Sequence, residues 1–130
     1  MAGYRTALGR ARGLGSAKSG VGHFIGQRVS AVALIFLALW GAWSVLALAK
    51  GGYDGARAGL GSPVNAALLI LLASAGFYHV QLGVRTIIED YIGDHMAKTA
   101  LLIGNAFLCL GAAAVTAVCL LKVALGGGAI

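Results

Sequence analysis

Long uncharged apolar runs alternate with short polar segments along this chain. No Asp, Glu, Lys or Arg occurs from Val29 to Ala49, and two further uncharged runs extend from Val64 to Val84 and from Thr99 to Leu121. A helix rises about 1.5 Å per residue, so about 20 residues cross the roughly 30 Å hydrocarbon core of a bilayer. The pattern predicts an all-α integral membrane protein with three transmembrane helices. The expected helices span about residues 29–49, 64–88 and 99–122.

The polar segments between these runs suggest how the chain is divided. Residues 1–28 are rich in Gly, Ser and Arg, contain no acid, and lack the apolar core and cleavage site of a secretory signal. A retained cytoplasmic arm is therefore expected, although a mitochondrial presequence has a similar composition. The Gly-rich segment 50–63 is expected to be a loop, with Ser62 and Pro63 starting the next helix and Gly93 as a candidate helix end. The expected divisions are an arm (1–28), a transmembrane domain (29–125) and a tail (126–130).

Composition narrows the class of protein. Of the 130 residues, 59% are hydrophobic and 11% are charged, whereas a soluble domain has about 25% charged residues. The chain has too few polar groups to cover its own surface, and too many apolar ones for a disordered protein. The net charge of +6 does not indicate nucleic acid as a partner, because the basic residues stand at the ends of the apolar runs. Membrane lipid is the expected environment.

The distribution of Lys and Arg predicts the orientation in the membrane. Of the ten basic residues, seven lie in the arm or in the link after the second run, and three lie on the other side. Because cytoplasmic segments carry the excess of basic residues, the N-terminus is expected in the cytoplasm and the C-terminus in the periplasm. A bacterial inner membrane is favoured over the mitochondrial inner membrane. The seven are Arg5, Arg10, Arg12, Lys18, Arg28, Arg85 and Lys98; the three are Lys50, Arg57 and Lys122.

His79 is the ionisable residue that stands out within the apolar runs, where such residues are costly and often functional. It belongs to a series of five residues that are 3, 4, 3 and 4 positions apart, two of them glycines, so all five lie on one stripe of a helix. Two interpretations remain open: a ligand of haem iron, or a small-residue packing interface whose histidine bonds to a neighbouring helix. Since one histidine cannot fill both axial positions of haem, the first interpretation predicts a hetero-oligomeric anchor helix bundle. The stripe consists of Gly76, His79, Gly83, Thr86 and Asp90.

Two further features lie near one membrane surface. Asp90 and Tyr91 follow His79 by 11 and 12 residues, about 17 Å along a helix. A tyrosine beside an acid can donate to a quinone carbonyl, but on local sequence alone a membrane-interface anchor is the favoured interpretation. Arg28 is the last charge before the first run. It either extends to the lipid headgroups or binds a propionate or an acid such as Asp90.

Two motifs follow one another along the chain: the stretch from Phe24 to Ser30, which contains Arg28, and the stretch HVQLGVRTIIEDY from His79 to Tyr91. Together they resemble the D-type hydrophobic membrane anchor of succinate dehydrogenase, respiratory complex II. The resemblance covers nearly the whole chain. It implies that His79 is one axial ligand of a haem b iron shared with the companion anchor chain. It also implies that Tyr91 bonds to ubiquinone with Asp90 beside it, and that Arg28 lies near the haem propionates or the quinone.

The resemblance also implies partners. The chain would be non-catalytic alone and would join a flavoprotein subunit, an iron–sulfur subunit and a C-type cytochrome b anchor subunit. That complex would link the tricarboxylic acid cycle to respiratory electron transport. The alternatives are a fumarate reductase anchor, a small proton-coupled transporter subunit in which His79 and Asp90 form a proton path, and a purely structural three-helix scaffold. The sequence does not define a role for His23 or for the segment 50–63.

Overall fold

The computed structural model describes residues 6–11, 13 and 20–126, and in this part of the chain it contains helices and no strand. This confirms the all-α prediction. Three of the helices are long and apolar enough to cross a membrane, which confirms the predicted number of spans. Parts of the expected arm (1–5, 12 and 14–19) and the end of the tail (127–130) lie outside the described residues. The helices are α1 (Ala7–Ala11), α2 (Gly20–Ala49), α3 (Gly52–Leu60), α4 (Pro63–Tyr91) and α5 (His95–Ala124).

The long helices extend beyond the apolar runs. Helix α2 begins at Gly20, whereas the uncharged run predicts a first span that begins at Val29, directly after Arg28. Uncharged runs underestimate such helices, because arginine can extend its charged group to the headgroups while its backbone remains helical. A 30-residue helix such as α2 is about 45 Å long, so part of it projects past the roughly 30 Å hydrocarbon core.

The Gly-rich segment between the first two spans is not simply a loop, which corrects the sequence prediction. Most of it forms helix α3. Gly52 has a φ of +62°, a left-handed conformation that lets the backbone turn sharply after α2. Gly59 packs so closely on Leu48 of α2 that a Cβ atom would overlap it. The side-chain amide of Asn65 donates to the Gly59 carbonyl at 3.0 Å and so joins α3 to α4. Tertiary contacts therefore override the low helix propensity of glycine.

The helix ends agree only partly with the expected signals. Pro63 is the first residue of α4, as predicted, and Ser62 occupies the N-cap position, but the Ser62 side chain makes no capping hydrogen bond. Gly93 lies in the short connection after α4, and its φ is not in the left-handed region. The stronger signal is Asp94, whose side chain accepts a hydrogen bond from the Ala97 N–H at 2.7 Å. This N-cap begins α5 and turns the chain back along α4.

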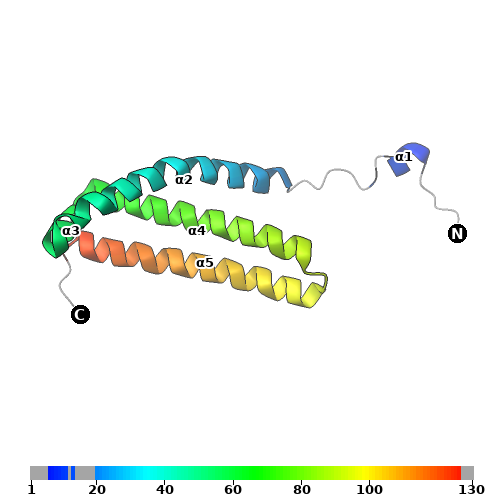
Figure 1. The fold of residues 1–130 in the computed structure, drawn as a ribbon. Helices are drawn as coiled ribbons and strands as arrows, with labels where there is room; N and C mark the ends of the chain where they lie inside the picture. The colour runs from blue at the N-terminus through cyan, green and yellow to red at the C-terminus, as the bar shows by residue number, and fades with distance from the viewer. Residues whose placement is uncertain (1–5, 12, 14–19, 127–130) are drawn as a thin grey trace.

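The three long helices form an open layer rather than a closed bundle. Helix α4 lies in the middle and packs against both α2 and α5, while α2 and α5 do not touch within the described residues (Figure 1). Helix α3 contacts the other three at one end of the layer. Most large apolar side chains are exposed on the isolated chain. Lipid or helices of other subunits would cover such surfaces, as the predicted hetero-oligomeric bundle requires.

A polar contact joins the two helices of the α4–α5 hairpin. The Asn105 side-chain amide of α5 donates to the Gln81 carbonyl of α4 at 2.9 Å. Asn105 also accepts a weak bond from the Cys109 thiol at 3.5 Å. Interhelical hydrogen bonds in membrane proteins contribute about 0.6–2 kcal/mol. The contact is therefore a modest but specific determinant of how α5 sits against α4.

Replacing Asn105 with alanine should lower the stability of the hairpin by about 1 kcal/mol through the loss of this bond. The measurement is the denaturation midpoint of the purified protein in detergent. Thr116→Ala is the matched control, because the Thr116 hydroxyl donates to the Ala112 carbonyl of its own helix at 2.8 Å and joins no second helix. Equal midpoints for the Asn105 variant and the control would contradict an interhelical role.

Candidate functional site

The stripe around His79 faces helix α2. A Cβ atom added to Gly83 would lie 3.7 Å from the Gln27 side-chain nitrogen, and one added to Gly76 would lie 4.0 Å from Leu34. Both neighbours are on α2, so the small residues of the stripe let the two helices approach. The packing interface that the sequence allowed is thus present. This packing does not exclude metal binding by His79. Whether the imidazole can bind a metal depends on what each of its two nitrogens contacts.

The Nδ1 atom of His79 lies 3.0 Å from the hydroxyl oxygen of Ser30 on α2. That hydroxyl also lies 2.8 Å from the Gly26 carbonyl and 3.1 Å from the Gln27 carbonyl. A carbonyl can only accept, and when the hydroxyl hydrogen is directed to the nearer carbonyl, that of Gly26, the hydroxyl oxygen accepts the Nδ1–H. In a neutral imidazole the other nitrogen, Nε2, then carries the lone pair. This is the tautomer that binds a metal through Nε2.

Gln27 is the side chain nearest to that lone pair. Its Nε2 amide nitrogen lies 3.4 Å from His79 Nε2, which is long for a hydrogen bond. Its Oε1 oxygen is buried and has no hydrogen-bond partner among the described residues. An unsatisfied buried acceptor costs about 1–3 kcal/mol. The ligating side of His79 is therefore covered by a weakly held amide rather than by a firm hydrogen bond.

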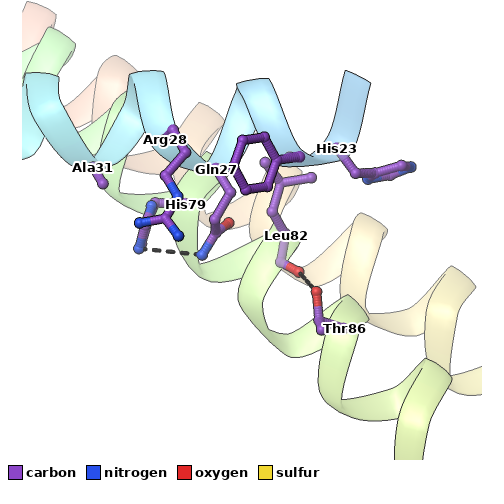
Figure 2. A pocket seen from close by; sticks show the side chains of 8 residues that line it. His23, Gln27, Arg28, Ala31, His79, Leu82 and Thr86 are labelled. Carbon is purple, nitrogen blue, oxygen red and sulfur yellow. Dashed lines mark hydrogen bonds between the residues drawn. The ribbon is translucent and has the colours of Figure 1, made fainter. Parts of the chain in front are cut away.

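These side chains line a pocket of about 420 Å³ between α2 and α4. His79 and Arg28 both line it, and Figure 2 shows the His23 ring at the opposite end of the drawn cluster from His79. The Arg28 guanidinium also stacks over the Phe24 ring, 5.2 Å from its centroid. Thr86 completes the lining, and its hydroxyl donates to the Leu82 carbonyl of its own helix at 3.1 Å. The predicted arginine and the predicted histidine therefore line the same pocket.

Asp90 and Tyr91 are not brought into this pocket. They end helix α4 with exposed side chains, Tyr91 being 82% exposed; neither lines the pocket around His79, and neither side chain makes a hydrogen bond to another described residue. No ion pair joins Arg28 to Asp90 in this part of the chain. The charged pair found there is Arg85 with Glu89, at 2.7 Å. Lys98 of α5 donates to the Glu89 carbonyl at 2.9 Å and ties the two helices together.

Comparison with known proteins relates this arrangement to a family. The model of the succinate dehydrogenase/fumarate reductase transmembrane subunit family matches residues 2–121. The chain belongs to this family. A succinate dehydrogenase hydrophobic membrane anchor subunit of Rickettsia bellii is 32% identical over 77% of this chain and 80% of its own length. Its namesake from Rickettsia conorii is 30% identical over 82% of this chain and 86% of its own length. No solved structure gives a significant match.

In this family member the sequence analysis missed three residues of the pocket region. His23 and Gln27 line the pocket, and Ser30 holds the His79 ring. Their positions differ by 4 and 3, so they lie on one face of α2. That spacing was visible in the sequence. It went unused because His23 and Gln27 precede the apolar run and were assigned to the N-terminal arm, residues 1–28.

Proposed function

We propose that this chain is the membrane anchor subunit of a succinate dehydrogenase and helps to bind a b-type haem and ubiquinone. The observation that carries the proposal is the state of His79: Nδ1 is engaged by Ser30, which leaves the Nε2 lone pair facing a pocket that also holds Arg28. The family assignment and the relatives named as succinate dehydrogenase anchors support the rest.

The residues present suit a haem. His79 would ligate the iron through Nε2, and the nearby Arg28 would pair with a propionate, for which a guanidinium is well matched. The loosely held amide of Gln27, with its unpaired Oε1, fits a site whose firm contacts form with a bound group. Haem supplies one-electron chemistry when bound. The companion C-type anchor chain would supply a further ligand and would cover the open layer of α2 and α4.

Tyr91 and Asp90 would serve the quinone. The phenol of Tyr91 would donate a hydrogen bond to a ubiquinone carbonyl, and the carboxylate of Asp90 beside it would tune the local charge. Both side chains are exposed on the isolated chain, at the end of α4 where α2 begins (Figure 1). A pocket there needs walls from other subunits. This agrees with a quinone site shared between chains.

The proposed orientation rests mainly on the N-terminal arm. Among the described long helices and their connections, Arg28, Arg85 and Lys98 lie towards one end and Lys50, Arg57 and Lys122 towards the other. The four remaining basic residues precede α2 in the sequence, and on that ground we assign them to the first end. We place that end, with Tyr91, in the cytoplasm. The flavoprotein and iron–sulfur subunits would then dock on the side where the quinone is reduced.

Purification through an affinity tag on this chain tests the proposal directly. We expect three further chains, a flavoprotein, an iron–sulfur protein and a second anchor, together with a b-type haem spectrum and succinate-dependent quinone reduction. An untagged strain serves as the control for non-specific capture. Recovery of the chain without these partners, with solute-dependent proton flux when it is placed in liposomes, would instead support the transporter interpretation.

A further inference from the structure

The strongest unassigned feature is the hydrogen-bond chain that ends at His79. We infer that Ser30 is a positioning residue for haem: it holds His79 in the tautomer whose Nε2 binds iron and fixes the orientation of the imidazole ring. This inference rests on the proposed function, because it assigns a role to a residue one step behind the proposed ligand. Ser30 is buried, at 6% exposure, and is the buried polar residue among those described.

The role of Ser30 depends on which group its hydroxyl donates to. The Ser30 hydroxyl lies 2.8 Å from the Gly26 carbonyl one turn earlier in α2 and 3.0 Å from His79 Nδ1. If the hydroxyl donates to the carbonyl, Nδ1 must carry the hydrogen and Nε2 is free to bind a metal. If the hydrogen bonds ran in the opposite direction, with the Ser30 hydroxyl donating to Nδ1, the hydrogen of the neutral ring would sit on Nε2 and block metal binding there. The shorter distance and the second carbonyl, of Gln27 at 3.1 Å, favour the first arrangement.

The location of Ser30 on a rigid helix makes it suitable for this role. Its oxygen is anchored to two backbone carbonyls of α2, so its position relative to α4 follows the packing of the two helices. That packing is close at this level, since a Cβ atom added to Gly26 would lie 2.7 Å from the Tyr78 hydroxyl. Partners behind metal-bound histidines set ring orientation and ligand basicity, and their loss weakens metal binding about 10–100-fold.

Comparing Ser30→Thr with Ser30→Val in the whole complex tests the inference. The two side chains have the same shape, but only threonine keeps the hydroxyl. We expect Ser30→Val to release haem to apomyoglobin about 10–100-fold faster than Ser30→Thr. We also expect a higher haem midpoint potential in the valine variant, because an imidazole without a hydrogen-bond acceptor at Nδ1 donates less electron density to ferric iron. Subunit stoichiometry after purification shows that both complexes are assembled.

The outcomes separate the inference from the proposed function. A wild-type complex without haem would refute the proposed function. A haem-containing wild type, with equal haem release and equal potentials in the threonine and valine variants, would refute the role of Ser30 alone. Slower release from the valine variant would also overturn it, because it would indicate that Ser30 donates to Nδ1. Thr116→Ala, which removes a hydroxyl bonded only within α5, should match wild type in both measurements.

Discussion

Replacing His79 with alanine is expected to remove the b-type haem spectrum from the complex purified through this chain, leaving less than about a tenth of the wild-type signal. His79 is the histidine of the α2–α4 pocket whose Nδ1 contacts Ser30, which would leave Nε2 to ligate iron, and alanine offers no ligating atom. His23 is unsuited to replace it, since its ring lies at the opposite end of the cluster in Figure 2. The measurement is the reduced-minus-oxidised difference spectrum per complex.

The matched control for this experiment is His95→Ala. His95 is exposed at the start of α5, and its ring lies 3.4 Å from the Thr99 hydroxyl, away from the pocket. Haem content should stay at the wild-type level in the control. An unchanged spectrum in the His79 variant would show that haem is ligated elsewhere. Loss of haem from both variants would point to a general failure of assembly.

Changing Tyr91 to phenylalanine is expected to slow electron transfer from succinate to ubiquinone about tenfold. The substitution removes the phenol hydrogen bond but keeps the ring, and losing one hydrogen bond of about 1.4 kcal/mol slows a reaction roughly tenfold. Succinate oxidation with an artificial soluble acceptor should be unaffected, because that reaction does not need the quinone. The ratio of the two activities is the quantity to measure.

Tyr53→Phe provides the comparison for Tyr91. Tyr53 lies in α3 at the other end of the helix layer and is 78% exposed, much like Tyr91 at 82%. Loss of the Tyr53 hydroxyl should leave both activities unchanged. If the Tyr91 variant lost both activities equally, the defect would lie in assembly. If it lost neither, Tyr91 would be an interfacial anchor, as its local sequence alone suggests.

Much of the fold follows directly from the order of residues. Three uncharged runs of about 20 residues have one stable solution in a bilayer, because only a helix satisfies its own backbone hydrogen bonds there. The expected helices were correct in type and number. Their ends were less predictable, since Arg28 and the polar residues before it are tolerated within a helix that extends past the membrane surface. The helical segment at Gly52–Leu60 was hidden by its glycines, which allow a close approach to α2.

The candidate site, like the fold, could be predicted only in part from the sequence. An isolated histidine in an apolar helix with glycines at matching spacing marks His79 from sequence alone, because a polar ring in lipid needs a partner. Which partner it has was decided only by tertiary structure. Helices α2 and α4 pack so that Ser30 meets Nδ1 and Arg28 shares the pocket, although 49 positions separate Ser30 from His79. Local periodicity describes single helices; the side-chain contacts between helices depend on how they pack.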